Sequence, residues 1–242
     1  MSGLFITGTD TGVGKTVVAA GLARLLSDRG TSVGALKPVE TGWEGSGTEW
    51  PPDGRLLADA ARMQDTRSDV VPHLFAEPLA PLVAARRCGQ PIEIAVIERA
   101  FEQLHRRYDC VLVEGAGGLS VPITESVWMA DLAKRLRLPV LVVARPTLGT
   151  LNHTFLTVHY ARTHELNVLG VVINGSRVGT TDVAEQTNPA MIEEMCRVPV
   201  LGMVPRRPSI TTPEEAAEAL AAGLDLDRLR RRYHALTGTD LC

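Results

Sequence analysis

Short apolar runs alternate with longer helical patterns along this 242-residue chain. Most of the apolar runs are rich in Val, Leu and Ile and lack polar alternation, which is typical of central strands in a parallel sheet covered on both faces. The predicted strands are GLFITG (3–8), SVGALKPV (32–39), CVLVEG (110–115), PVLVVA (139–144), VLGVVIN (168–174) and PVLGMVP (199–205). Helical spacing predicts helices over 15–30, 92–108 and 150–166, the first closed by Gly30. The pattern therefore predicts an α/β fold, a single doubly wound and mostly parallel sheet with helices on both faces.

The length allows one large domain, and we expect a single α/β domain over residues 1–242. A helical segment over about 206–242 ends it, and Thr212-Pro213-Glu214 is a good helix start. One stretch, TGWEGSGTEWPPDG (41–54), is rich in Gly and Pro and follows a predicted strand end. Ligands bind beyond the carboxyl ends of strands in such sheets. Residues 41–54 are thus either a mobile active-site loop or a surface insertion.

Composition narrows the class of partner. Twenty-five Lys and Arg against 28 Asp and Glu give a net charge of −3, which lacks the basic excess expected of a protein that mainly binds nucleic acid. No apolar run reaches about 18 residues and no signal peptide is visible, so we expect neither a membrane span nor export. Four cysteines without a C-x-x-C pair, and six histidines without metal-ligand spacing, predict a reduced, cytoplasmic protein with no zinc site.

The segment GTDTGVGKT (Gly8–Thr16) links a predicted strand to a predicted helix. Backbone N–H groups and a helix N-terminus form an anion site at such a junction. Lys15 would reach the outer phosphates of a nucleotide, and the Thr16 hydroxyl would take Mg²⁺. The common phosphate-binding loop, however, reads G-x-x-x-x-G-K-[ST], which puts Thr9 where its first glycine stands. The sequence thus predicts a P-loop NTPase site with a glycine one residue early.

Two further strand ends carry charged residues. YDCVLVEGAGG ends a strand in Glu114, which could coordinate Mg²⁺ as a Walker-B acid does. The glycines after it, Gly115, Gly117 and Gly118, allow close approach of the backbone to a ligand, although a structural turn explains them equally well. Lys37 precedes Pro38 in ALKPVETG and is either a compact positive charge beside an anionic substrate or a surface lysine.

Polar residues also mark the last two predicted strand ends. Asn174 ends VLGVVIN, and its amide is suited to pairing with adenine or to capping the strand end. In LGTLNHT, Thr150 or Asn152 begins a predicted helix, either as an ordinary cap or as part of an anion site.

Taken together, GTDTGVGKT, KPVETG, VEGAGGLSVP, LGTLNHT and GVVIN resemble the dethiobiotin synthetase family in motif, order and interval. The resemblance runs from the N-terminus to about LGMVP (201–205). It implies an ATP- and Mg²⁺-dependent ligase (a cyclo-ligase of biotin biosynthesis) that acts as a homodimer. The reaction implied joins CO₂ to an amine of 7,8-diaminopelargonic acid as a carbamate, phosphorylates the carbamate with ATP, and closes the ureido ring with release of ADP and phosphate. The family loop has the early glycine, so the shifted spacing is its ordinary form.

The resemblance also implies roles for single residues. The residues implied to face the carbamate and γ-phosphate are Thr11, Lys15 and Lys37. The implied nucleotide contacts are Gly12, Val13, Gly14, Lys15, Thr16, Glu114, Gly115, Gly117 and Asn174. The implied substrate contacts are Thr41, Gly117, Gly149, Thr150, Leu151 and Asn152, the last four receiving the substrate carboxylate across the dimer interface. The implied Mg²⁺ ligands are Thr16, Asp53 and Glu114.

Asp53 is open to competition. The segment before it is longer than usual for the family, so Glu44, Glu49 or Asp59 could take its place. Two other P-loop classes also stay open. A partitioning-type switch ATPase usually carries a lysine at the position of Asp10, and an amidoligase-type ATPase usually adds a glutaminase domain for which 242 residues leave little room.

Overall fold

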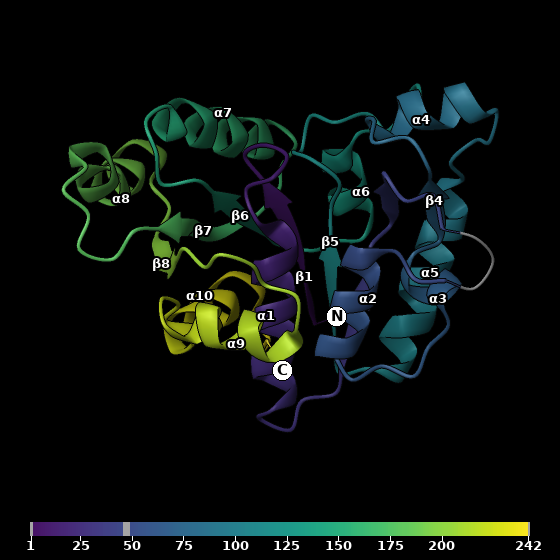
Figure 1. Ribbon diagram of the computed structural model, residues 1–242, viewed down its shortest axis with the longest axis horizontal. Helices are drawn as coiled ribbons and strands as arrows, with labels where there is room; N and C mark the ends of the chain where they lie inside the picture. Colours follow the sequence, from purple (N-terminus) through teal and green to yellow (C-terminus); the bar gives the residue numbers. More distant parts are fainter. Residues whose placement is uncertain (1, 46–48, 242) are drawn as a thin grey trace.

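The computed structural model describes residues 2–45 and 49–241. Its centre is a six-stranded sheet with the order β2-β5-β1-β6-β7-β8, in which all neighbouring strands are parallel (Figure 1). The strands are β1 (Gly3–Gly8), β2 (Val33–Leu36), β5 (Cys110–Glu114), β6 (Val140–Ala144), β7 (Val168–Ser176) and β8 (Val200–Pro205). Each of the six predicted apolar runs supplies one of them, so the predicted fold class is confirmed.

Helices cover both faces of this sheet. They are α1 (Lys15–Ser27), α2 (Pro52–Ala60), α3 (Arg67–Val70), α4 (Pro81–Cys88), α5 (Ile94–Arg107), α6 (Met129–Arg135), α7 (Thr150–Thr163), α8 (Val183–Cys196), α9 (Pro213–Ala221) and α10 (Leu226–Thr237). The chain runs from β1 to β2 in one direction and reaches β5, β6, β7 and β8 in the other. Because such crossovers are right-handed, α1 lies on one face and α5 to α8 lie on the other. The direction reverses at β1, so the loop after β1 lies at the switch point where ligands bind.

The predicted strand over 32–39 is broken. β2 ends at Leu36, and β3 (Val39–Thr41) pairs instead with β4 (His73–Phe75) in a separate two-stranded sheet. The backbone N–H of Lys37 donates to the Val70 carbonyl oxygen at 2.8 Å, and Pro38 has no N–H to offer a ladder. The break lets Lys37 leave the central sheet at its carboxyl edge.

The predicted irregular stretch over 41–54 is partly regular. Thr41 closes β3, and Pro52 begins α2, with its proline at the first helical position. Residues 46–48 of this stretch lie outside the described residues. The prediction of an irregular loop was therefore wrong at both ends.

The C-terminal segment packs on the sheet and on α1. Helix α9 lies against α1, where a Cβ on Gly21 would come within 2.6 Å of the Ala216 carbonyl oxygen, so a larger residue would push the helices apart. Thr212 caps α9 and forms a capping box with Glu215, which confirms the predicted helix start. Helix α10 contacts β7 and β8.

Two smaller expectations are met among the described residues. Gly30, with φ of +87°, closes α1, since the Thr31 N–H donates to the Leu26 carbonyl oxygen at 3.2 Å. Cys110 is buried in β5 as a small core residue. Within residues 2–45 and 49–241, no helix is both long and apolar enough to cross a membrane.

Candidate active site

The loop between β1 and α1 is folded tightly back on itself. A Cβ on Gly8 would lie 2.7 Å from the Asp10 carbonyl oxygen and 2.8 Å from Val13 Cγ2, so only glycine fits there. Gly12 and Gly14 have φ of +74° and +89°, and Gly14 leads directly into α1. The early glycine is thus required sterically by the turn, and the loop places backbone N–H groups at the N-terminus of α1.

Lys15 turns back over this loop. Its side chain is buried, and its Nζ donates to the Asp10 carbonyl oxygen at 3.1 Å. Burial lowers the pKa of the Lys15 ammonium, the nearby Glu114 carboxylate opposes that effect, and the charge of Lys37 adds to it. A bound anion beside Lys15 would offset the cost of burying this charge.

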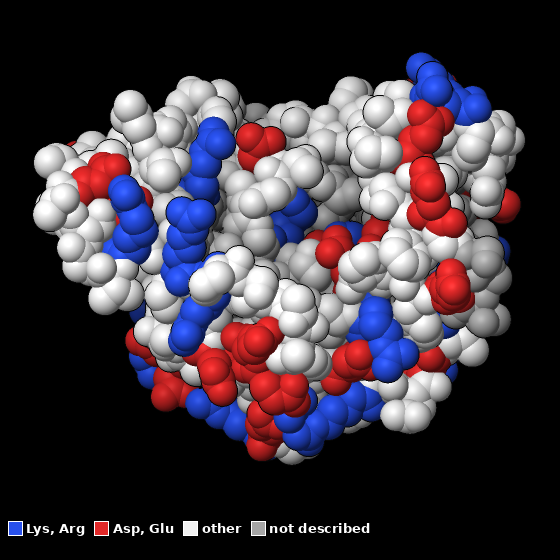
Figure 2. Space-filling view, viewed as in Figure 1, with Lys and Arg blue, Asp and Glu red and all other residues white. Residues whose placement is uncertain are grey.

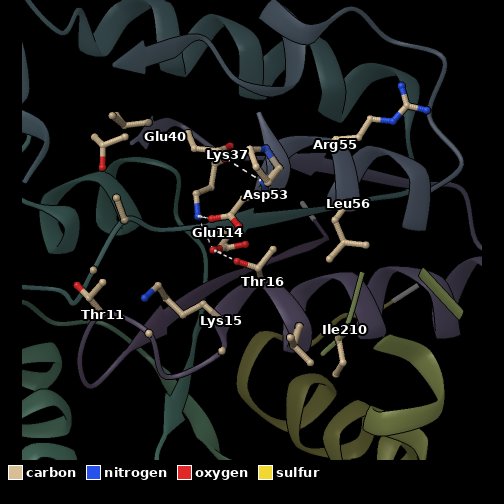
Figure 3. Close-up of a pocket in the computed structure, with 18 of the residues that line it drawn as sticks. Thr11, Lys15, Thr16, Lys37, Glu40, Asp53, Arg55, Leu56, Glu114 and Ile210 are labelled. Carbon is tan, nitrogen blue, oxygen red and sulfur yellow. Dashed lines mark hydrogen bonds and ion pairs between the residues drawn. The ribbon is translucent and has the colours of Figure 1, made fainter. Parts of the chain in front are cut away.

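Four side chains from different elements converge beside the loop (Figure 3). The Lys37 Nζ lies 2.8 Å from Asp53 Oδ2 and also contacts Glu114 Oε1. Thr16 Oγ1 donates to the same Glu114 oxygen at 3.0 Å. Parallel strands bring their carboxyl ends to one edge, which is why Glu114 at the end of β5 and Lys37 after β2 meet there.

Lys37 is a cation held between two carboxylates. Burial by itself would lower the pKa of the Lys37 ammonium, but the charges of Glu114 and Asp53 outweigh burial and raise it above its usual value. Burial likewise acts to raise the pKa of Asp53, and Lys37 outweighs it and lowers that pKa. Lys37 therefore stays charged at neutral pH, and it is not the surface lysine that the sequence left possible.

The oxygen donors at this cluster fit a hard divalent cation. Glu114 Oε2 is buried and has no hydrogen-bond partner among the described residues. Thr16, Asp53 and Glu114 present a hydroxyl and two carboxylates, the ligand types that Mg²⁺ prefers. Nowhere in residues 2–45 and 49–241 do three or more His, Cys, Asp or Glu side chains gather as a metal cluster, so a cation here would rely on few protein ligands.

A cavity of about 690 Å³ opens over the cluster. Figure 2 shows it as a hollow near the centre of the face, where basic and acidic side chains lie together. The predicted site residues that line it are Thr11, Gly12, Gly14, Lys15, Thr16, Lys37, Thr41, Asp53, Glu114 and Gly117. Of the competitors for the place of Asp53, only Asp59 lines the cavity, and its carboxylate pairs with Arg55 at 2.7 Å.

The turn after Glu114 packs closely against the phosphate-binding loop. A Cβ on Gly115 would lie 2.9 Å from the Phe5 ring, and one on Gly118 would lie 3.0 Å from the Gly8 carbonyl oxygen. Gly117 has φ of +67° and lines the cavity. A Cβ on Gly117 would lie 2.8 Å from Val121 Cγ2, so contacts within the protein account for all three glycines, and of the three only Gly117 lines the cavity.

Asn174 lies on the other side of the loop. Its Nδ2 donates to the Val13 carbonyl oxygen at 3.0 Å, and a Cβ on Gly14 would lie 2.0 Å from that nitrogen. A second cavity of about 360 Å³ begins here, and its wall includes Gly12, Val13 and Asn174. Three arginines, Arg145, Arg177 and Arg206, also line it, and Figure 2 shows basic side chains gathered on this side of the molecule.

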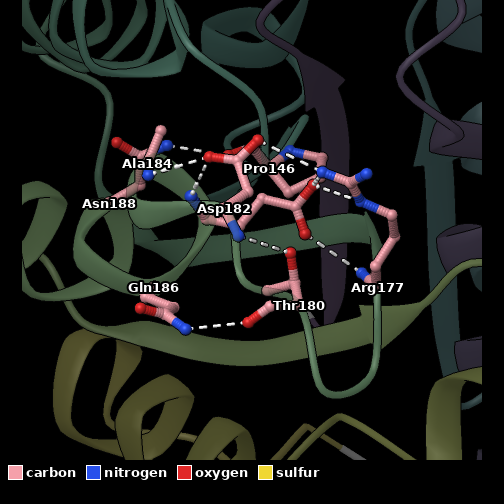
Figure 4. A network of polar contacts seen from close by, with 8 residues as sticks. Pro146, Arg177, Thr180, Asp182, Ala184, Gln186 and Asn188 are labelled. Atoms are coloured by element: carbon pink, nitrogen blue, oxygen red, sulfur yellow. Dashed lines mark hydrogen bonds and ion pairs between the residues drawn. The ribbon is translucent and has the colours of Figure 1, made fainter.

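A polar network braces the wall of this second cavity (Figure 4). Asn188 Nδ2 donates to the Pro146 carbonyl oxygen at 2.7 Å, which ties α8 to the end of β6. Arg177 lies 2.9 Å from buried Glu185 and 3.1 Å from Asp182, the residue that caps α8. These contacts hold the loop between β7 and α8 in place beside the second cavity.

Comparison with known proteins assigns the family. The AAA-domain family profile matches residues 2–214. The chain is 45% identical over 208 residues to the ATP-dependent dethiobiotin synthetase BioD of Bacillus licheniformis, covering 85% of this chain and 86% of the relative. It is 44% identical over 212 residues to the enzyme of the same name from Thermodesulfovibrio yellowstonii, covering 84% and 88%. This chain belongs to the ATP-dependent dethiobiotin synthetase family.

Solved structures with much lower sequence identity share the fold of this dethiobiotin synthetase family member. A ParA family ATPase from Chlorobium tepidum matches with a TM-score of 0.55 at 15% identity, covering 97% of this chain and 96% of that one. The cell division ATPase MinD of Pyrococcus furiosus matches with a TM-score of 0.52 at 19% identity, covering 98% and 100%. At such low sequence identities, the two structural matches show only a shared fold. The family assignment rests on the Bacillus and Thermodesulfovibrio relatives.

One group of residues implied by the dethiobiotin synthetase resemblance lies apart from the cavity. Helix α7 begins at Thr150 after Gly149, which has φ of +94°, and among the described residues no side chain caps it. Neither Thr150 nor Asn152 is thus the cap that the sequence suggested, and Thr150 is buried. None of residues 149–152 lines the large cavity of their own chain.

Several cavity residues were missed by sequence reasoning. They are Val17, Val39, Glu40, Trp50, Pro52, Arg55, Leu56, Ala116, Ile210 and Thr211. Leu56 and Ile210 come from α2 and the loop before α9, and no sequence pattern links the two. Glu40 did carry a signal, because it is a carboxylate between Val39 and Thr41 next to the strand end that supplies Lys37.

Proposed function

We propose that this chain makes dethiobiotin from 7,8-diaminopelargonic acid, CO₂ and ATP. A substrate amine and CO₂ give a carbamate, and a carbamate oxygen attacks the γ-phosphorus of ATP with loss of ADP. The second amine then attacks the carbonyl carbon of the mixed anhydride. Phosphate leaves and the ureido ring closes.

The observation that carries this proposal is a second buried lysine in the phosphate site. Any P-loop enzyme uses a lysine at the position of Lys15. Lys37 is charged, lines the same cavity, and is near enough to Lys15 to lower its pKa. Two ammonium groups there suit a reaction in which an anionic acceptor meets an anionic phosphate donor, because their charges offset the repulsion between the two.

Mg²⁺ completes the proposed site. Thr16, Asp53 and Glu114 would hold it, and the unpartnered Glu114 Oε2 supports that assignment. When bound, the ion would offset phosphate charge as the phosphoryl group is transferred. Thr11 and Thr41 line the cavity and would contact the substrate, as would the backbone at Gly117.

Nucleotide recognition is proposed to extend to Asn174. An amide carries two N–H donors and one acceptor oxygen, so its bond to Val13 leaves groups able to meet a base. The second cavity at Asn174 continues from Gly12 and Val13, the residues at which the phosphates are expected. We propose that ATP spans from the large cavity to this one.

We further propose that the active form is a homodimer. The start of α7, Gly149–Asn152, would serve the substrate carboxylate in the partner's cavity, since it does not line its own. Exposed apolar side chains beside it support an interface, namely Leu148 at 86%, Phe155 at 40% and Leu156 at 55% exposure.

The decisive experiment measures dethiobiotin and phosphate with MgATP, the diamine and bicarbonate. We expect equal amounts of both products, and we expect phosphate release to fall to background when the diamine is omitted. If the rate of phosphate release is the same with and without the diamine and bicarbonate, the protein is a switch ATPase and the proposal is overturned.

A further inference from the structure

Glu40 of β3 reaches across to the first turn of α2. Its Oε1 accepts a hydrogen bond from the Asp53 N–H and its Oε2 accepts one from the Gly54 N–H, both at 2.9 Å. The side chain is 5% exposed and lines the large cavity. A carboxylate on one element thus binds two backbone donors of another.

Among the described residues, no side chain of α2 or of its N-cap residue satisfies the N–H groups at the helix start. Its N-cap is Pro51, whose side chain cannot accept a hydrogen bond, and Pro52 at the first helical position has no N–H. The next two N–H groups, of Asp53 and Gly54, are those that Glu40 binds. Glu40 therefore acts as the cap of α2 from outside the helix, and its negative charge suits the helix N-terminus.

The same bonds set the direction of a proposed metal ligand. The Asp53 backbone is fixed by Glu40 while its side chain points the other way, with Oδ2 2.8 Å from Lys37 Nζ. We propose that Glu40 is a positioning residue that holds Asp53 in place for Mg²⁺, an inference that rests on the function proposed above. Glu40 itself touches neither metal nor substrate in this assignment.

The location of Glu40 supports a role in the site in addition to helix capping. Glu40 is buried in the cavity wall beside Asp53, a place where burying a carboxylate is costly unless hydrogen bonds satisfy it. At the start of α6, by comparison, the Asp131 carboxylate accepts a hydrogen bond from the Trp128 N–H at 2.8 Å, outside the large cavity. The Glu40 carboxylate at the start of α2, in contrast, lies in the wall of the large cavity.

The first test is Glu40→Gln, which keeps the size but leaves one acceptor oxygen where there were two. Mg²⁺ is titrated into protein holding a non-hydrolysable ATP analogue, and the heat of binding gives the apparent Mg²⁺ affinity. Residues that orient metal ligands typically change metal affinity by about 10- to 100-fold, so we expect a loss of that size. In turnover, the Mg²⁺ concentration needed should rise by a similar factor, while the rate at saturating Mg²⁺ changes much less.

Asp131→Asn is the matched control, because it removes the same charge from a helix start outside the cavity. It should lower thermal stability without changing Mg²⁺ affinity. A Glu40→Gln protein that loses stability alone, with Mg²⁺ affinity within two-fold of the parent, overturns the proposal, as does one that cannot fold.

A double-mutant cycle with Asp53→Asn tests the route of the effect. If Glu40 acts through the Asp53 carboxylate, adding Glu40→Gln to Asp53→Asn should cost less than about two-fold in Mg²⁺ affinity. Losses that multiply in the double variant would show an independent role and overturn the inference. The titration does not need dethiobiotin to form, so failure of the proposed function would be seen separately, as a parent protein without diamine-dependent turnover.

Discussion

Lys37 Nζ lies 2.8 Å from Asp53 Oδ2, although the residues are 16 positions apart and belong to different elements. The same ammonium contacts Glu114, the last residue of β5. This arrangement keeps Lys37 protonated within reach of the phosphate-binding loop. The roles proposed for these residues lead to separate expectations.

Lys37→Gln should lower dethiobiotin formation by roughly 10²–10³, the usual effect of removing one preorganised group at a developing charge, about 3–4 kcal/mol. ATP binding should stay nearly intact, because Lys15 remains. Lys37→Arg should rescue poorly, since a wide guanidinium does not replace a compact ammonium. The measurement is product formed per minute at saturating substrates, alongside ATP binding.

The control for Lys37 is Lys134→Gln, which changes an exposed lysine paired with Glu165. It should leave turnover unchanged. A Lys37→Gln enzyme that works within a few-fold of the parent would mean that Lys37 has no part in the reaction.

Lys15→Ala should weaken ATP binding and remove most turnover while the fold survives. The reason is that Lys15 is the loop's own cation, held over the backbone by its bond to the Asp10 carbonyl oxygen. Calorimetric titration with ATP tests the first effect, and circular dichroism tests the fold. Unchanged ATP affinity together with unchanged activity would contradict the phosphate-site assignment.

Glu114→Gln and Asp53→Asn should each raise the Mg²⁺ concentration needed for half-maximal turnover, because each removes a charged oxygen ligand. Asp59→Asn is the control within the same cavity, since Asp59 pairs with Arg55 and should not contribute to the metal site. The measurement is turnover against Mg²⁺ at fixed ATP. Should Asp59→Asn shift the requirement and Asp53→Asn leave it alone, the assignment of Asp53 is wrong.

The protein should have the mass of a dimer in light scattering. Phe155→Asp should give monomers with much lower turnover, because it puts a charge on the exposed apolar side of α7. Val83→Asp is the control, as Val83 is equally exposed at 41% but lies on α4. A fully active monomer would refute the shared site.

Stability should fall on acidification in part through His73. Burial lowers the pKa of His73 below its usual value of 6.5, so below pH 6.5 the unfolded chain takes up a proton that the folded chain resists. His73 thus contributes to stability above that pH and loses the contribution as pH falls through it. In urea unfolding at pH 7.5 and 5.5, His73→Gln should lose less stability between the two than the parent. An equal loss in both proteins would show that His73 contributes nothing.

The sequence by itself determined the sheet and the loop. Apolar runs such as 110–115 and 139–144 bury both faces of a strand, and that requirement is visible in composition alone. Gly14-Lys15-Thr16 was readable because loop, helix start and lysine are neighbours in the chain. The family resemblance came from the same local motifs, and the comparison with known proteins confirmed it.

Tertiary structure decided how the strand ends combine. Pro38 and the Lys37 N–H end β2 early, which no count of apolar residues reports. Lys37 and Glu114, which form an ion pair, are 77 positions apart in the sequence. Glu40 caps α2 by binding the N–H groups of residues 13 and 14 positions after it. Such contacts depend on which strands become neighbours in the sheet. Hydrophobic periodicity does not predict that strand order, because it indicates only which face of each element is buried.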